Sequence, residues 1–147
     1  MTVAYPKQYA EMFTFVDDFN DREALNIFGY KPDILWPMVT SNKNQPVELA
    51  FMRVSVQTVI ERQITLRKEH RRFETQGILF IQLFLPRSDA QSSAKGYTWS
   101  RAVRDEFRRA NLPTDTIFRN ARVNEIPAEA KYYRLNVVVE YQFDETQ

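Results

Sequence analysis

Hydrophobic residues in the first part of the chain recur at steps of three and four, the spacing that places side chains on one face of an α-helix. Pro6 suits the first turn of this helix, where a backbone N–H has no partner within the helix. We expect the acidic stretch 17–21 to end the helix, or to interrupt it before a short turn over 22–28 that stops at Gly29. The apolar positions of this pattern are Tyr5, Tyr9, Met12, Phe13, Val16 and Phe19.

Two strands of one long hairpin are predicted in the middle of the chain. After an expected polar loop at 40–46, residues 47–59 alternate in the manner of a strand, and 60–71 is charged enough to form the far end of the hairpin. Residues 73–85 form the returning strand, in which Gly77 marks a bulge or a close backbone approach. Because this strand is apolar at both odd and even positions, we expect both of its faces to be covered.

The second half of the chain predicts a helix followed by another hairpin. Residues 86–96 have the composition of a loop whose later half can begin the helix, and the helix extends to about Ala110. Strands at 116–126 and 132–143 are joined by a short turn at 127–130, so they are antiparallel. The last strand places one alternating set inward: Tyr133, Leu135, Val137, Val139, Tyr141 and Phe143.

These elements follow the order helix, strand, strand, helix, strand, strand. The simplest layered arrangement of that order is an α+β fold, with a largely antiparallel or mixed sheet of about four to five strands and two helices packed on one face. The length of 147 residues suits one domain, which we expect to span 1–147.

Composition limits the class of protein and the cellular compartment that we expect for this domain. Hydrophobic residues make up 44% and aromatic residues 14% of the chain, enough for a substantial core. The chain contains no cysteine, so it can form neither a disulfide nor a thiolate metal site. No apolar run approaches the ~20 residues of a membrane span, and the N-terminal residues lack the pattern of a secretory signal. We therefore expect a soluble protein of the cytoplasm with no membrane partner.

The net charge of +1 conceals a separation of opposite charges along the sequence. Acidic residues are concentrated in the first helix, and basic residues are concentrated at the far end of the first hairpin. A basic stripe lies along one side of the second helix. Such blocks can pair between copies of one protein, although ordinary solvated faces have the same pattern. The residues that we assign to a subunit or partner interface are Asp17 and Asp18; Arg62, Arg67, Lys68, Arg71 and Arg72; and Arg101, Arg104 and Arg108.

The sequence offers no recognisable residues for catalysis or for a cofactor. His70 is the single histidine and lies among cations, which discourage both its protonation and a bound metal ion, so a solvated surface histidine is the better interpretation. The three glycines, Gly29, Gly77 and Gly96, are too far apart for a phosphate-binding loop. We expect no catalytic, metal or cofactor site and no enzyme activity, while catalysis by residues distant in sequence stays open.

The basic block at 62–72 also allows a nucleic-acid interpretation, because clustered cations can bind phosphates. The sequence pI of about 7.9 is below the values typical of dedicated nucleic-acid-binding domains. We therefore favour a protein contact for these arginines and keep a nucleic-acid-binding module as an alternative.

The order of the segments matches a known pattern. An amphipathic N-terminal helix leads into a proline-bracketed apolar stretch, a polar loop, a long strand, an arginine-rich segment that continues into an apolar strand, a charged helix and a closing strand. After the first helix and the loop, these segments are Asp33–Pro37, Phe51–Val56, Arg71–Gly77, Leu79–Leu85, Ser93–Ala110 and Val139–Glu145. In this order the chain resembles the tail terminator, or tail completion, proteins of long-tailed phages.

The resemblance implies a structural protein of the virion, located in the tail or neck after assembly in the host cytoplasm. Such proteins form a ring, usually of six subunits, on the head-proximal end of the tail tube. The ring stops tube polymerisation and presents a surface to the head–tail connector protein, and DNA passes through its lumen without specific recognition. The implied partners are further copies of the chain, the tail tube protein and the connector. Another head–tail connector or neck (head completion) protein is the alternative within the same class.

Overall fold

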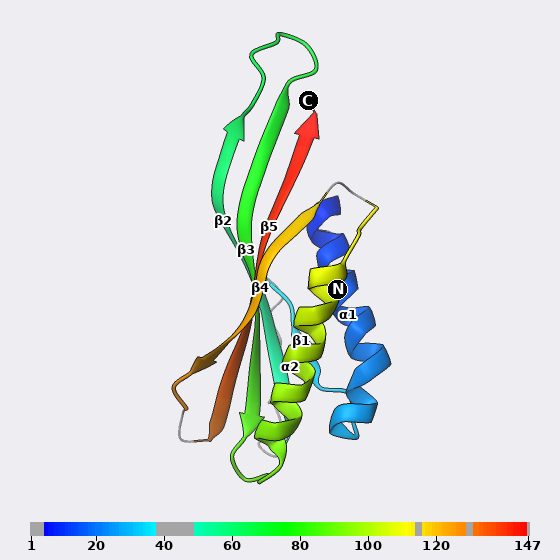
Figure 1. Ribbon diagram of the computed structural model, residues 1–147, viewed down its shortest axis with the longest axis vertical. Coiled ribbons are helices and arrows are strands. Elements are labelled where there is room, and N and C mark those ends of the chain that lie inside the picture. The colour runs from blue at the N-terminus through cyan, green and yellow to red at the C-terminus, as the bar shows by residue number, and fades with distance from the viewer. Residues whose placement is uncertain (1–4, 38–48, 114–115, 129–130, 147) are drawn as a thin grey trace.

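The computed structural model describes residues 5–37, 49–113, 116–128 and 131–146 of the chain (Figure 1). The expected loop at 40–46 lies outside these residues. The described part folds into two helices and five strands, which confirms the predicted α+β class. In chain order the elements are α1 (Lys7–Phe28), β1 (Asp33–Leu35), β2 (Phe51–Gln63), β3 (Arg72–Pro86), α2 (Ser92–Arg109), β4 (Ile117–Ile126) and β5 (Tyr132–Thr146).

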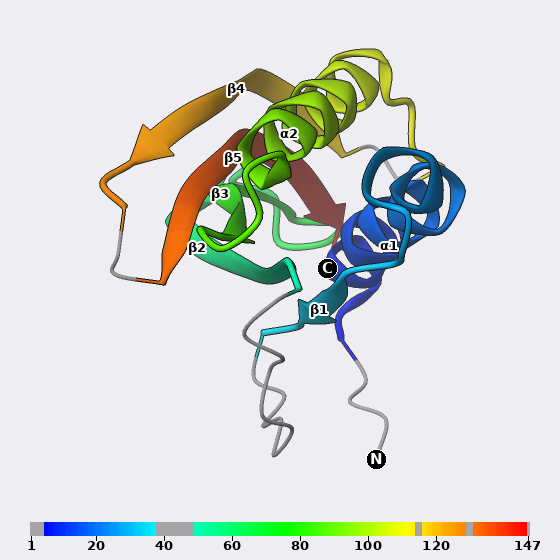
Figure 2. The same ribbon diagram turned by 90° about the horizontal axis from the view of Figure 1, so that it is seen from below.

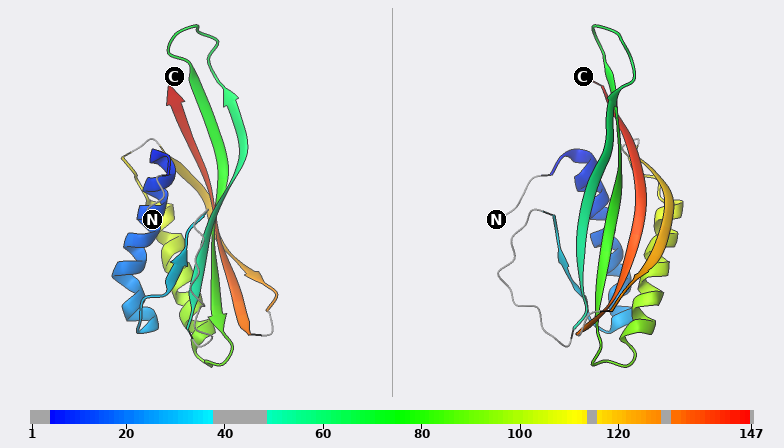
Figure 3. Two further views of the ribbon diagram at one scale, coloured as in Figure 1. Left: turned by 180° about the vertical axis from the view of Figure 1, so that it is seen from behind. Right: turned by 90° about the vertical axis from the view of Figure 1, so that its left-hand side faces the viewer.

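One mixed sheet contains all of these strands, in the order β1-β2-β3-β5-β4. The pairs β2 with β3, β3 with β5 and β4 with β5 are antiparallel, whereas the short β1 pairs parallel with the start of β2. Both helices lie on the same side of this sheet, as Figures 2 and 3 show. α2 packs on β3, β4 and β5 and also contacts α1. The predicted packing of two helices on one face is therefore confirmed.

The first helix is longer than the sequence predicted. α1 is one continuous helix of 22 residues, so the expected end or interruption at 17–21 is wrong. The Lys31 ammonium lies 3.8 Å from a carboxylate oxygen of Asp17 and also forms an ion pair with Asp21. Because one cation serves both carboxylates, the repulsion between neighbouring acids on the helix surface is reduced.

The C-terminal end of α1 is fixed by two polar contacts. The buried side-chain amide of Asn20 donates to the carbonyl of Pro32 at 3.1 Å, which ties the helix to the segment that follows it. Gly29 has a left-handed φ of 81°, and its N–H donates to the carbonyl of Leu25 at 3.0 Å. The chain then turns back along α1 and enters β1 beside β2.

The core lies between the helices and the sheet. Phe19 of α1 and Trp99 of α2 are buried against each other, with ring centroids 5.6 Å apart in an edge-to-face arrangement. Each large apolar side chain buried in this way contributes roughly 1.5–3 kcal/mol relative to an exposed one. The other large, fully buried side chains are Met12, Val16, Met52, Val54, Leu79, Ile81, Leu83, Leu85, Val103 and Phe107.

The central strand β3 differs from the prediction on one face. Its side chains toward the helices, such as Leu79 and Ile81, are fully buried, whereas Ile78 and Phe80 on the other side are only partly buried. No described helix or strand packs on that other side, which we call the open face (Figure 2). The expected cover on both faces is therefore wrong. Side chains such as Val138, which lies opposite Phe80 and is 3% exposed, are shielded by neighbouring strands instead.

One boundary also differs from the prediction, and another agrees with it. β2 continues to Gln63, so the ladder with β3 extends farther toward the hairpin end than the expected 47–59. α2 begins at Ser92, in the later half of the segment 86–96, where the sequence allowed the helix to begin. The Ser92 hydroxyl donates to the carbonyl of Pro86 at 2.6 Å, so a side chain fixes the start of the helix.

We expect Gly77→Ala to lower the free energy of unfolding by about 1–3 kcal/mol. A Cβ at this position would lie 2.5 Å from the backbone oxygen of Gln57 and would also collide with the hydroxyl of Tyr141. The backbone oxygen cannot move aside without disturbing the pairing of β2 with β3. Urea unfolding followed by circular dichroism measures the loss. Gln82→Ala, in the same strand but on the open face, is the matched control and should cost less than about 0.5 kcal/mol; equal losses would contradict the expected clash.

Stability should fall as the pH rises above about 10. Burial raises the pKa of Tyr141 above its ordinary value of 10.0, and its hydrogen bond to Tyr9 adds to the rise. A folded-state pKa above the unfolded value gives stability that is complete below the unfolded pKa and is lost at higher pH. The raised pKa values of Tyr5, Tyr97 and Lys31 act in the same direction.

The urea midpoint of the wild-type protein should therefore decrease between about pH 9 and about pH 11. Tyr141→Phe, which has no hydroxyl to ionise, should show a smaller decrease over the same interval. If the two proteins lose stability in parallel, the buried phenol of Tyr141 is not a source of the pH dependence.

Candidate assembly surface

The far end of the β2–β3 hairpin extends beyond both helices (Figures 1 and 3). We call residues 59–73 the hairpin arm; it contains the end of β2, the connecting segment 64–71 and the start of β3. At about 3.3 Å per strand residue, the 15 residues of β3 span roughly 50 Å. At about 1.5 Å per helical residue, the 18 residues of α2 span roughly 27 Å. The helices are thus too short to cover the whole hairpin, and the arm projects into solvent.

Two ion pairs hold the base of the arm. Arg62 lies 3.2 Å from a carboxylate oxygen of the buried Glu74, which joins β2 to β3. Arg72 lies 2.6 Å from a carboxylate oxygen of Asp144, which joins β3 to β5. Arg62 and Arg72 were both expected at a partner interface, and the structure shows that their guanidinium groups have partners within the chain.

Local contacts close the connecting segment at the tip. The N–H of Ile64 donates to the carbonyl of Arg72 at 2.9 Å, and the N–H of Arg72 donates to the hydroxyl of Thr65 at 3.0 Å. Arg71 donates from Nε to the carbonyl of Arg67 at 3.1 Å. The tip is therefore held by hydrogen bonds of its own residues, without packing against the core.

The outer surface of the arm combines large apolar side chains with cations. Leu66 is 96% exposed at the tip, although burying a leucine is worth roughly 1.5–3 kcal/mol. Arg67 and Lys68 follow it directly, are exposed and form no ion pair with any residue that the structure describes. Neighbouring exposed apolar residues on an otherwise charged surface are typical of a protein interaction site. The further exposed apolar side chains of the arm are Val59, Ile60 and Ile64.

The two predicted interface acids of α1 differ in their surroundings. Asp17 shares Lys31 with Asp21, and the hydrogen bond to Asp21 raises the pKa of the Lys31 ammonium. Asp18 is exposed and forms no ion pair within the described ranges. The same helix exposes 61% of Leu25. The C-terminal half of α1 points away from the arm (Figure 1), so a single chain does not bring the predicted acidic and basic sets together.

Two of the three arginines in the predicted basic stripe of α2 form contacts within their own chain. Arg104 lies 3.0 Å from Asp105 and is mostly buried. Arg108 donates to the carbonyl of Ala121 from Nη2 at 2.9 Å and from Nε at 3.3 Å, at the bulge where β4 shifts its register against β5. Arg101 is exposed, with no ion pair to another described residue. Of the three, only Arg101 has its guanidinium available to a partner.

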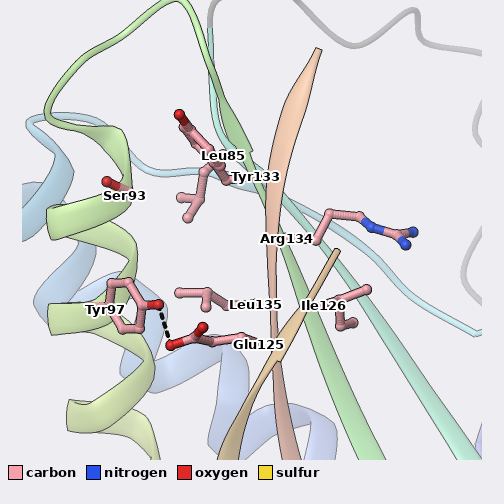
Figure 4. A pocket seen from close by; sticks show the side chains of 8 residues that line it. All are labelled: Leu85, Ser93, Tyr97, Glu125, Ile126, Tyr133, Arg134 and Leu135. Carbon is pink, nitrogen blue, oxygen red and sulfur yellow. Dashed lines mark hydrogen bonds between the residues drawn. The ribbon is translucent and has the colours of Figure 1, made fainter. Parts of the chain in front are cut away.

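A pocket of about 330 Å³ lies at the opposite end of the molecule from the arm, between the start of α2 and the paired ends of β4 and β5 (Figure 4). Tyr97 donates from its hydroxyl to Glu125 Oε1 at 2.5 Å, and this hydrogen bond raises the pKa of Tyr97. The sequence placed Tyr133 inward, and it lies on the helix side of the sheet opposite Leu85, where it is 39% exposed because β5 begins there. The lining residues are Leu85, Ser93, Tyr97, Glu125, Ile126, Tyr133, Arg134 and Leu135.

Two of the polar side chains in this pocket are paired with each other. Tyr97 and Glu125 are hydrogen-bonded, and the described lining contains no histidine or lysine that could activate Ser93 as a nucleophile. Sequence reasoning missed the pocket because its residues come from separate elements and form no spaced motif.

The described part of the chain contains no group of three or more histidine, aspartate or glutamate side chains that could hold a metal ion. None of its helices is both long enough and apolar enough to cross a membrane. His70 is exposed in the arm, with a left-handed φ of 53°.

Comparison with known proteins adds no relative to this picture. Neither a scan against protein-family models nor a search of curated proteins found a match to the chain. The function has to be argued from the surfaces of the molecule itself.

Arg108→Ala should lower the free energy of unfolding by about 1 kcal/mol, because it removes two donors from the carbonyl of Ala121 in the β4 bulge. Arg101→Ala removes the same kind of side chain from the same helix and should change stability by less than about 0.5 kcal/mol. Chemical denaturation of both variants measures the difference. Equal effects would show that the contact with the bulge contributes nothing.

Proposed function

We propose that this protein is a structural subunit of a phage tail, which forms a ring, of six copies, at the head-proximal end of the tail tube. The ring stops polymerisation of the tube protein and offers a surface to the head–tail connector, while DNA passes through its lumen. This function needs surfaces for several protein partners and no catalytic group. The observation that carries the proposal is the hairpin arm, whose exposed leucine and adjacent cations have no partner in the described part of their own chain.

Ring formation requires two unlike surfaces on each subunit, because identical subunits joined head to tail close when their rotation divides a circle. The arm supplies one such surface, basic and apolar. The outer face of α1 supplies a different one, acidic and with an exposed leucine. These two surfaces cannot meet within one chain, and this supports an arrangement in which neighbouring copies bring them together.

The edges of the sheet offer a further route to neighbours. β1 pairs with β2 only from Phe51 to Arg53, and beyond Arg53 no described strand lies along the outer edge of β2. β4 forms the other edge. The central strand β3 is paired on both sides and has no free edge. Edges such as those of β2 and β4 can accept a strand from another subunit.

The nucleic-acid alternative has less support. Two of the five cations in the basic block are paired with carboxylates, and on the open face Arg122 lies 3.0 Å from Glu140. A cation already paired with a carboxylate releases less free energy on binding a phosphate. Arg67 and Lys68, which form no ion pair in the described chain, directly follow an almost wholly exposed leucine, a combination that suits a protein surface better than a phosphate backbone.

The purified protein should stop the elongation of tail tubes when it is added to polymerising tube protein. Leu66→Asp should abolish this effect without changing the melting temperature, because the side chain contacts no core residue. Ala90→Asp, an exposed position at the opposite end of the molecule, is the matched control and should act as wild type. Electron microscopy of tube length provides the measurement.

The result also separates the proposed function from its alternatives. Binding to DNA-filled capsids but not to tubes would support a head-completion or neck protein instead. Tight, salt-sensitive binding to duplex DNA that is lost in Arg67→Ala/Lys68→Ala would support a nucleic-acid-binding module. A protein that stays monomeric and binds neither tubes nor capsids nor DNA would contradict the proposal.

A further inference from the structure

We propose that the tip of the hairpin arm of one subunit docks on the outer face of α1 in a second copy of this chain. The inference deepens the proposed ring, since it names the surfaces through which neighbouring subunits meet. It is specific to one pair of surfaces, so it can fail while the ring itself stands.

The arm contributes an exposed apolar side chain followed by two positive charges. Leu66 is almost wholly exposed, and Arg67 and Lys68 lie next to it along the chain. The hydrogen bonds of Ile64, Thr65 and Arg72 hold this tip in one conformation before any partner binds. A preformed tip loses little conformational entropy on docking.

The outer face of α1 is complementary to the tip of the arm, because it offers both an apolar contact and negative charge. Thr14, Asp18, Asp21 and Leu25 follow one another at steps of four, three and four, so they lie along one face of the helix, and all are exposed. Leu25 offers an apolar contact for Leu66, at 61% exposure. Asp18 offers a carboxylate without an ion pair in the described part of the chain.

The charge balance of the two elements favours this match over a contact between like surfaces. α1 contains five acidic residues against two basic ones, whereas residues 60–72 contain five lysines and arginines against two acids. Asp17 and Asp21 share Lys31, and Arg62 and Arg72 pair with carboxylates of their own chain. The match therefore relies chiefly on Asp18 of the helix and on Arg67 and Lys68 of the arm. Two arms or two α1 faces would repel each other, and an arm and an α1 face attract. Partly exposed charges of this kind set partner choice and association rate, while the apolar contact supplies most of the affinity.

The docking partner has to be another chain. The arm extends away from the helices, and α1 descends from near the base of the arm toward the other end of the molecule (Figures 1 and 3). The face from Asp18 to Leu25 lies in the half of α1 that is distant from the tip. The contact is therefore head to tail, the kind that generates a closed ring.

Charge reversal in two separate variants tests the inference. Arg67→Glu/Lys68→Glu reverses the arm, and Thr14→Lys/Asp18→Lys reverses the α1 face. Each variant alone sets like charges against each other, and we expect its assembly, measured by native mass spectrometry and on tail tubes, to weaken at least about tenfold. In an equimolar mixture each reversed arm can meet a reversed helix and each native arm a native helix. Assembly should then return to within about threefold of wild type, with the two variants alternating.

The controls separate the possible failures. Lys131→Glu, a charge reversal at an exposed position just before β5, should assemble as wild type, and thermal unfolding should show that all variants fold. If wild type assembles and the reversed variants assemble equally well, the inference is overturned and the ring stands. If the variants fail alone and also fail as a mixture, the arm docks elsewhere and the inference is overturned. If wild type assembles neither alone nor on tubes, the proposed function fails with it.

Discussion

The difference in length between extended and helical chain is the constraint on which this molecule depends. Two helices pack on one face of a sheet, and the core they form with it holds the fold together. A strand gains more than twice as much length per residue as a helix, so a hairpin of comparable residue number must extend past the helices. The arm follows from this geometry. Its far end has no helix to pack against, and its apolar residues, Leu66 above all, remain in solvent.

The arginines divide into two groups with different roles. Arg62 and Arg72 join neighbouring strands at the base of the arm, and Arg108 satisfies a carbonyl where a bulge interrupts the pairing of β4. Arg67 and Arg101 extend into solvent with no carboxylate partner in the described chain. The first group stabilises the fold. The second group forms no ion pair in the described chain, so fewer cations are unpaired there than the basic composition suggests.

The hairpin arm and the outer face of α1 are surfaces that the core does not constrain. The arm can change in sequence at little cost to stability, because its contacts are local hydrogen bonds and two ion pairs at its base. The outer face of α1 is free in the same way, since the inner face of that helix supplies the core. This separation lets a small domain change its partners while it keeps its fold, and it suits a protein whose role is to join other proteins.

Hydrophobic periodicity alone determined much of the architecture. It predicted two helices, the strands of both hairpins and the α+β class, because burial on one face leaves a regular pattern in the sequence. Tertiary contacts decided the rest. α1 continues through its acidic stretch because Lys31, beyond the helix, pairs with Asp17 and Asp21, and β3 is apolar on an uncovered face because adjacent strands shield it. Which cations are free to meet a partner depends on carboxylates and carbonyls that are distant in sequence, and only the folded chain brings these groups together.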